Sequence, residues 1–181
     1  RGLQPMDTHF TPFDLDLRDG RAVHVRMIRT SDEAAILEAF ERLSPEARYM
    51  RFMRAVAEPN VERLREVLSS LPETGLGITA TVPDHDGFAI VGNALFLVGP
   101  EPGSCEFSAT VAADYGGLGL GRALITALIA AARQRGLHEM EGYVLARNQP
   151  MLRLAAHLGF NIRPDPDDFS VRICRLPLAD T

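Results

Sequence analysis

The feature that most constrains this chain is a run of glycines placed between a strand-like segment and a helix-like one. Four of the six residues from Gly116 to Gly121 are glycine. The preceding segment, Glu106–Ala112, alternates as a strand does, and the following segment, Gly119–Arg135, carries apolar residues at helical spacing. Glycines let a backbone approach a bulky anion, and a helix N-terminus adds partial positive charge. This order predicts a site for a phosphorylated ligand, with tight packing without a ligand as the alternative.

Two common nucleotide-binding loops do not fit this run of glycines. A dinucleotide fold places its loop after the first strand, with an acidic residue about 20 residues further on, whereas this loop follows several strand-like segments. A Walker loop ends in Gly-Lys-Ser/Thr, whereas this one ends in Gly121-Arg122-Ala123. The phosphorylated ligand is therefore expected in a different fold.

The order of the remaining elements indicates the fold class. Three successive strands joined by short turns imply an antiparallel meander. Ser31–Glu33 is expected to cap the first helix, and Ser44 and Asn60 are expected to start the next two. The fold class is therefore α+β (mixed α/β), around a sheet of about six or seven strands. Strands are expected at Ala22–Ile28, Leu76–Val82, Phe88–Val98, Glu106–Ala112, Glu141–Ala146 and near Ser170–Leu176, and helices at Ala34–Leu43, after Ser44, and at Val61–Leu71, Gly119–Arg135 and Pro150–Leu158.

Length and composition favour one core and exclude several classes of partner. The chain has 181 residues, of which 46% are hydrophobic. Its net charge of -5 is spread without a basic block, which argues against nucleic acid. Cys105 and Cys174 lack the spacing of metal ligands, so no metal is expected. No apolar stretch approaches ~20 residues, so we expect a soluble cytoplasmic protein without membrane contact.

The domain organisation follows from the same observations. We expect a flexible N-terminal arm over residues 1–13 and a single domain over residues 14–181. Met6 is the first methionine, so residues 1–5 are expected to be vector-derived and are left out of the functional argument.

The glycine loop and the segments around it resemble the GNAT acyltransferases. The hallmark of that superfamily is a Gln/Arg-x-x-Gly-x-Gly/Ala loop, in which Gly119 and Gly121 match the small positions and Gly116 departs from the Gln/Arg position. The resemblance runs from about Arg21 to Phe160 and includes a second motif at Tyr143–Phe160. A closer likeness is to the acyltransferase domain of bacterial protein-lysine acetyltransferases, carried by Leu17–Gly20, Leu43–Tyr49 and Glu106–Asp114.

The resemblance implies an enzyme that moves an acetyl group from acetyl-CoA to a primary amine in a ternary complex. It implies a mostly antiparallel sheet with about four or five helices on its two faces. The acceptor is either a protein lysine or a small-molecule amine. The charges of Ser44–Leu71 are mixed and do not favour one of these acceptors over the other. A homodimer is left open. The residues expected to bind coenzyme A are Thr110, Val111, Gly116, Gly117, Leu118, Gly119, Leu120, Gly121, Arg122 and Asn148.

The general base is expected at Glu106. A lysine-like amine with a pKa near 10.4 is only about 0.04% neutral at pH 7, so attack on a thioester needs a base or a strongly desolvating site. Strand alternation places Glu106, Ser108 and Thr110 on one face. In the resembling lysine acetyltransferases the matching glutamate is the base, acting through water. The alternative for Glu106 is a solvated strand charge.

The general acid is less well supported by the sequence. Many members of the superfamily carry a tyrosine seven residues after the motif asparagine, and Ala155 occupies that position here. Either Tyr143 substitutes from the neighbouring strand or the thiolate leaves unaided. Two other functions therefore stay open: an acyl-CoA sensor without catalysis, and an interaction module that uses residues 6–13 or the Ser44–Leu71 helices.

Overall fold

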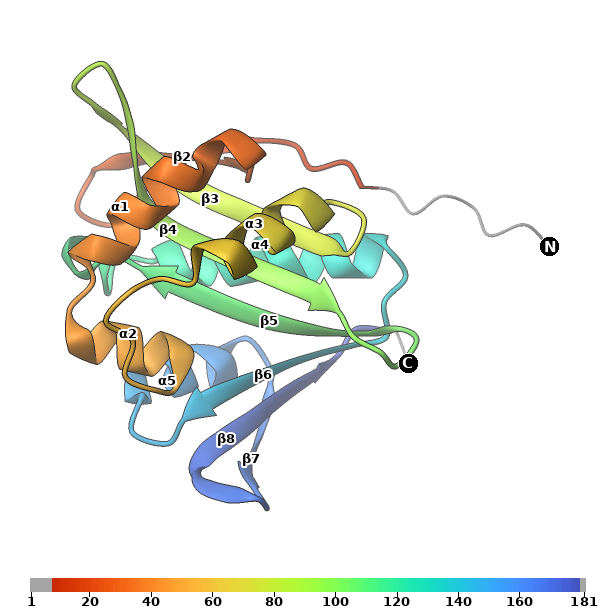
Figure 1. The fold of residues 1–181 in the computed structure, drawn as a ribbon. Helices are drawn as coiled ribbons and strands as arrows, with labels where there is room; N and C mark the ends of the chain where they lie inside the picture. Colours follow the sequence, from red (N-terminus) through yellow and green to blue (C-terminus); the bar gives the residue numbers. More distant parts are fainter. Residues whose placement is uncertain (1–7, 180–181) are drawn as a thin grey trace.

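A computed structural model describes residues 8–179 and contains one mixed sheet of eight strands. The strands lie in the order β1-β2-β3-β4-β5-β6-β8-β7, and every neighbouring pair is antiparallel except β5 and β6 (Figure 1). The strands are β1 (Phe13–Asp16), β2 (Ala22–Met27), β3 (Gly75–Asp84), β4 (Gly87–Val98), β5 (Ser104–Val111), β6 (Glu139–Leu145), β7 (Asn161–Asp165) and β8 (Asp168–Pro177). The predicted mostly antiparallel α/β fold is confirmed.

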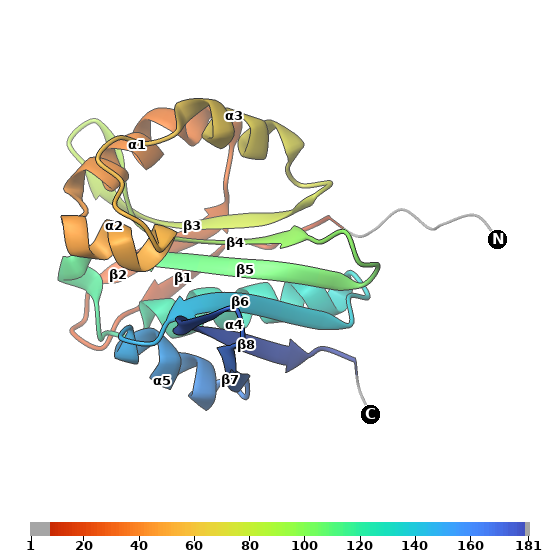
Figure 2. The ribbon, with the colours of Figure 1, turned by 60° about the horizontal axis from the view of Figure 1, so that its bottom comes forward.

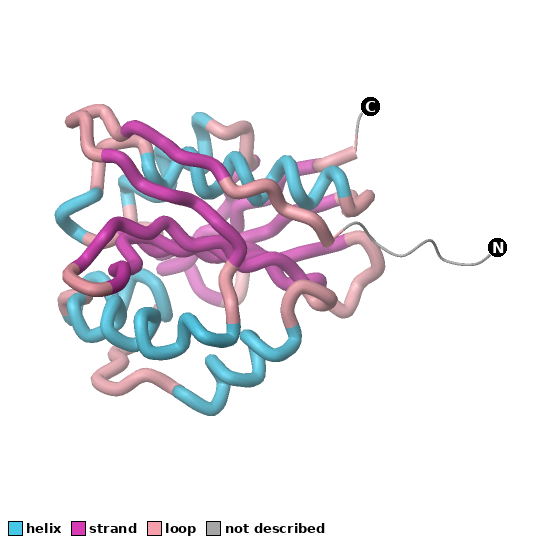
Figure 3. The backbone as a smooth tube through the Cα atoms, turned by 90° about the horizontal axis from the view of Figure 1, so that it is seen from above, coloured by secondary structure: helices cyan, strands magenta, loops and turns pink. Residues whose placement is uncertain are grey.

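Helices cover both faces of the sheet. α1, α2 and α3 lie over one face and α4 lies against the other (Figure 2), so the strands form a layer between helices (Figure 3). The helices are α1 (Glu33–Arg42), α2 (Pro45–Phe52), α3 (Val61–Ser70), α4 (Leu120–Gln134) and α5 (Gln149–His157). None of the helices within residues 8–179 has the length and apolar character needed to cross a bilayer.

The predicted count of six or seven strands is too low, because both edges of the sheet carry short strands. β1 has four residues and alternates between half-buried and exposed positions, too short a pattern to stand out in the sequence. β7 contains Pro164, which a strand tolerates at a sheet edge. Phe13 of the expected arm belongs to β1, and the centroid of its ring lies 6.2 Å from that of Phe10. Residues 1–7 of that arm lie outside the described residues.

A buried ion pair fixes α1 over the sheet. Arg26 of β2 donates two hydrogen bonds to the Asp32 carboxylate, at 2.8 and 2.9 Å, and the backbone N–H of Arg29 donates a third at 2.7 Å. Both charged side chains are almost fully buried. Asp32 is the N-cap residue of α1, within the expected segment Ser31–Glu33, but its side chain is turned back toward β2 and makes no capping hydrogen bond to α1.

The pairing of β5 with β6 is short, and the two strands separate beyond it. Only Ser104–Glu106 pair with Glu139–Glu141, after which the strands diverge (Figure 1). Just past the last pair, the ring of Phe107 lies against Gly142 and stands 5.1 Å from the ring of Phe160. A glycine is needed on β6 because any Cβ there would collide with the Phe107 ring.

We expect Gly142→Ala to destabilise the fold by about 1–3 kcal/mol, because the added methyl group overpacks the buried Phe107 ring. Urea unfolding of the two proteins measures this difference. The matched control is Gly87→Ala, since a Cβ at that strand glycine meets no atom within 4 Å. Equal stability of the native protein and Gly142→Ala would show that β5 and β6 move apart freely at this point.

Candidate active site

The glycine run forms an exposed turn that presents backbone donors at the start of α4. Gly117 and Gly119 have positive φ angles of 70° and 94°, which favour glycine. The first hydrogen bond of α4 runs from the Ala123 N–H to the Gly119 carbonyl at 3.1 Å. The amides of residues 120–122 precede this bond, so they have no partner inside the helix. This is the anion-binding geometry that the sequence predicts.

The two leucines of the run contribute backbone and not side chains to this turn. The side chain of Leu120 is buried in the core and that of Leu118 packs against it. The Leu118 carbonyl accepts a hydrogen bond from the Arg18 N–H at 3.3 Å, which ties the turn to the segment after β1. Any contact of Leu120 with a ligand therefore involves the main chain alone.

A cleft of about 730 Å³ opens between β5 and β6, in front of the glycine turn. We call it the glycine-loop cleft. Among residues 8–179 its lining contains basic side chains and no aspartate or glutamate, although the chain as a whole carries a net charge of -5. Ten of the lining residues are Arg18, Arg51, Thr110, Val111, Gly116, Gly119, Arg122, Tyr143, Asn148 and Arg153. A basic, acid-free lining suits a ligand with several negative charges.

Asn148 lies in this cleft as a helix cap. Its side-chain oxygen accepts a hydrogen bond from the Met151 N–H at 3.4 Å, and its carbonyl accepts one from Leu152 at 3.1 Å. Capping holds the start of α5 against the cleft, where Met151 and Leu154 add apolar lining.

A second cavity of about 530 Å³ lies on the opposite side of β5, under α1 and α3. We call it the helix-covered cavity. Its walls are mainly apolar, and Glu106 is the one acidic residue in the part of its lining that the structure describes. Arg51, Phe107, Ser108 and Thr110 line both this cavity and the glycine-loop cleft. The two spaces therefore meet along β5, with Glu106 beside their junction.

Glu106 has a shifted protonation equilibrium. Its side chain keeps access to solvent. The surrounding protein removes part of its hydration and so raises its pKa, the charge of Glu141 raises it further, and the charge of Arg51 acts in the opposite direction. Glu141 is the register partner of Glu106 across the last pair of β5 and β6. A carboxylate with a raised pKa is better placed to carry a proton near neutral pH than an ordinary glutamate.

Comparisons with known proteins assign the family. The sequence profile described as "Acetyltransferase (GNAT) domain" matches residues 23–161. The chain is 34% identical to Acetyltransferase PA5475 of Pseudomonas aeruginosa over 162 residues, which is 90% of this chain and 87% of that protein. This chain belongs to the GNAT acetyltransferase family.

Solved structures agree with this fold. The GNAT domain of the Streptomyces lividans protein PAT has a TM-score of 0.82 and 22% identity, with 92% of this chain and 96% of that chain covered. The Salmonella typhimurium putative acetyltransferase yncA, solved with acetyl-CoA, has a TM-score of 0.68 and 23% identity, with 88% of this chain and 95% of that chain covered.

Within this GNAT site, Tyr143 is the tyrosine on β6, the strand opposite the glycine turn. Its side chain is 37% exposed and lines the glycine-loop cleft. The interaction with Glu141, together with partial burial, raises the pKa of Tyr143 to about 12, so its phenol keeps its proton at neutral pH. Ala155, which stands where many family members have a tyrosine, is 1% exposed and is absent from the cleft lining.

Sequence reasoning missed three arginines of this GNAT site. Arg18 comes from the turn after β1, Arg51 from α2 and Arg153 from α5. They are far apart in the sequence, and only the fold brings them to one cleft. Arg18 could have been predicted as a site residue, since it falls in the Leu17–Gly20 segment that carries the family resemblance.

We expect Glu141→Gln to lower the pKa of Glu106, because the substitution removes the like charge beside it. Arg51→Gln should raise the same pKa, because it removes an opposite charge. An NMR titration of the Glu106 carboxyl carbon measures both shifts. Glu46→Gln is the control, since Glu46 is exposed on α2 and pairs with Arg147 at 3.8 Å. An unchanged pKa in both test variants would mean that solvent screens the two neighbours.

Proposed function

We propose that this protein transfers the acetyl group of acetyl-CoA to a primary amine, a protein lysine or a small-molecule amine, by direct attack in a ternary complex. One observation carries the proposal: a basic cleft with free helix N-terminal amides meets a second cavity at the strand that bears Glu106. Such an arrangement accommodates two substrates that meet at a shared wall. A cytoplasmic location stays a prediction from the sequence, and the oligomeric state stays open.

The residues of the glycine-loop cleft fit coenzyme A. The amides of residues 120–122 would bind the pyrophosphate, and Arg18, Arg122 and Arg153 supply positive charge around it. When bound, acetyl-CoA supplies an acetyl group activated as a thioester. The apolar part of the lining, including Met151 and Leu154, suits the uncharged arm of the same molecule.

Glu106 is proposed as the general base. An amine arrives mostly as an ammonium ion, so a proton must leave before the nitrogen attacks. Glu106 lines the helix-covered cavity and keeps solvent access, which suits proton transfer through a water molecule. Its raised pKa brings it closer to that of the amine.

Tyr143 is proposed as the proton donor to the leaving sulfur. Its phenol lines the glycine-loop cleft and stays protonated at neutral pH, because its pKa is raised to about 12. A phenol with so high a pKa is a weak acid, so unaided departure of the thiolate is the alternative for this step.

A sensor that binds acyl-CoA without catalysis is the second candidate. The observation in its favour is the buried Ala155 at the position of the family tyrosine. The two candidates differ in one measurement, the release of free thiol from acetyl-CoA in the presence of a panel of peptides, amino acids, polyamines and aminoglycosides. Binding without thiol release for every amine would favour the sensor.

We expect Gly119→Val to weaken the binding of coenzyme A, because a β-branched side chain at a φ of 94° reshapes the turn that carries the free amides. Isothermal calorimetry measures the affinity. The matched control is Gly136→Val, since Gly136 has a φ of 75° at the far end of α4. Both variants should lose about 1–2 kcal/mol of stability through backbone strain. Equal affinity in the two variants would show that the turn is only structural.

We expect Glu106→Gln to keep the fold and the affinity for coenzyme A and to lower turnover by about 10²–10⁴-fold, because the amide cannot accept the proton. The pH dependence of kcat should lose the rising limb that belongs to Glu106 and keep that of the amine. Steady-state rates across pH measure this change. Turnover within about threefold of the native protein at every pH would identify Glu106 as a solvated strand charge.

A further inference from the structure

The helix-covered cavity has an unusual combination of walls. Its volume of about 530 Å³ is in the range of small-molecule sites. Most of its lining is aliphatic or aromatic, as with Ile36, Phe40 and Leu68. Its charged lining residues, within the described range 8–179, are four arginines and one glutamate: Arg42, Arg51, Arg54, Arg63 and Glu106. An occupant therefore has a sizeable apolar part, one amine for Glu106 and a negative group for an arginine.

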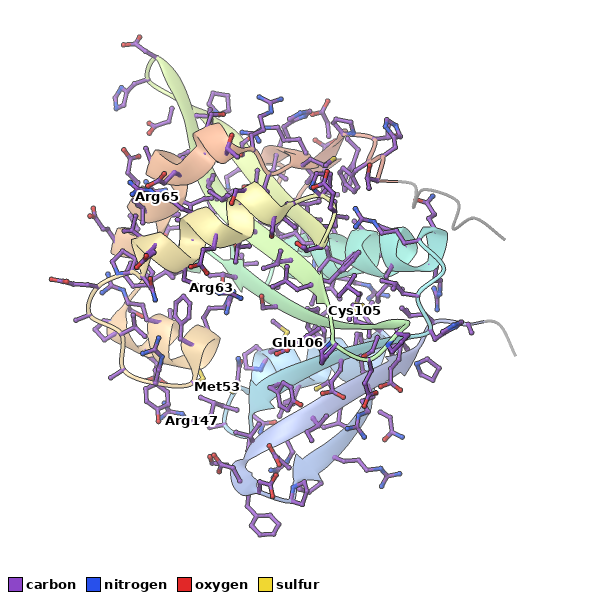
Figure 4. All side chains as sticks on the ribbon, turned by 45° about the vertical axis from the view of Figure 1, so that its right-hand side comes forward. Met53, Arg63, Arg65, Cys105, Glu106 and Arg147 are labelled. Atoms are coloured by element: carbon purple, nitrogen blue, oxygen red, sulfur yellow. The ribbon has the colours of Figure 1, made fainter. Side chains whose placement is uncertain are left out.

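The shape of this cavity suits a small molecule better than a lysine side chain of a protein. A lysine reaches a site through an unbranched four-carbon stem that ends in one charge. Such a stem would leave empty most of the space that extends under α1 and α3. The excess of arginine over glutamate also repels acceptors with several positive charges, such as polyamines. Figure 4 labels two of the charged lining residues, Arg63 on α3 and Glu106 on β5.

Arg51 is the arginine placed to bind a group next to the reacting amine. It comes from α2, is half-buried, and lines both the helix-covered cavity and the glycine-loop cleft. Its guanidinium lies 4.9 Å from the ring of Phe52. Within residues 8–179 its guanidinium makes no hydrogen bond, and its charge acts on Glu106. Five N–H donors and a positive charge are thus available beside the proposed base.

We propose that the acceptor is a free α-amino acid with a large apolar side chain. Its amine and carboxylate share one carbon atom, so they require a base and a cation in the same cavity, and Glu106 and Arg51 both line this cavity and interact electrostatically. Its side chain then enters the apolar part of the helix-covered cavity. This inference rests on the proposed acetyl transfer and narrows its acceptor.

The proposed reaction balances as follows. Glu106 takes one proton from the ammonium group. The nitrogen–acetyl bond forms as the carbon–sulfur bond of the thioester breaks. One of the two remaining hydrogens of the nitrogen leaves as a proton and ends on the sulfur. The products are an N-acetyl amino acid and the free thiol of coenzyme A.

A panel of acceptor amines, assayed with the native protein, tests the proposed acceptor class. The panel compares L-leucine, L-methionine and L-phenylalanine with leucinamide, glycine, spermidine and a lysine peptide, with thiol release as the measurement. We expect kcat/KM for leucine to exceed that for leucinamide, which lacks the carboxylate, by about tenfold or more. Glycine should also be poor, because it leaves the apolar space empty. The chain itself contains no lysine, so any acetyl-lysine found by mass spectrometry comes from the peptide.

Arg51→Gln tests the carboxylate contact. The substitution should lower the ratio of kcat/KM for leucine to kcat/KM for leucinamide by about tenfold to a hundredfold, because only leucine loses a charge-assisted contact, whereas the raised pKa of Glu106 acts on both acceptors. Calorimetry of leucine binding to the protein with coenzyme A should show the same loss without turnover. The control is Arg65→Gln, since Arg65 lies outside the cavity lining and pairs with Glu33 at 2.9 Å. If Arg51→Gln does not fold, Arg51→Lys and the leucine-to-leucinamide ratio of the native protein take its place.

Ala39→Leu tests the apolar part of the site. Ala39 lines the cavity from α1, and leucine keeps a helix almost as well as alanine. Filling the cavity should move the preference from leucine and phenylalanine toward alanine and glycine. A lysine peptide or spermidine preferred over leucine by tenfold or more would overturn this inference and leave acetyl transfer intact. Thiol release with none of the amines would overturn the proposed function itself.

Discussion

The end of the short pairing between β5 and β6 is the constraint on which the site depends. Three residues of each strand pair, and beyond Glu106 and Glu141 the backbones diverge. If the pairing continued, β6 would close the space in front of the glycine turn. Because it stops, the glycine-loop cleft opens, and residues on β5 line spaces on both sides of the sheet. The Phe107 ring against Gly142 occupies the point of separation.

The same point places two carboxylates side by side and gives them different environments. Glu141 accepts a hydrogen bond from the Arg175 Nε at 2.7 Å. Partial burial acts to raise the pKa of Glu141, but the contacts with Tyr143 and Arg175 lower it overall. The pKa of Glu106 is raised, with Glu141 as one cause. When the pKa values of two neighbouring acids move apart, one stays charged and the other can exchange a proton. Here Glu141 has the lowered pKa and Glu106 the raised one.

The sequence predicted those features that depend on local patterns. The glycine turn, the antiparallel meander and the helices after Ser44 and Asn60 follow from turn, strand and capping signals, and the side chains of Ser44 and Asn60 cap α2 and α3 as expected. The short edge strands β1 and β7 carry too few residues for a pattern. Arg51 and Arg153 were missed because long-range packing alone brings them to the cleft.

α2 contributes residues to the lining of both the glycine-loop cleft and the helix-covered cavity. None of its residues is fully buried, and polar contacts hold it in place. Arg48 donates hydrogen bonds to the carbonyls of Phe40 and Glu41, which lie in α1, and to the carbonyl of Ala57, which follows α2. These bonds tie α2 to α1 and to the segment between α2 and α3.

Contacts of α2 with the segment after β6 complete its attachment. Arg147 reaches α2 through Glu46, at 3.8 Å, and lies 4.7 Å from the ring of Tyr49. A helix attached in this way can change its exposed residues with little cost to the core, because surface substitutions usually alter stability only slightly. The exposed residues of α2 can therefore vary while the glycine turn and the separation of β5 from β6 stay the same.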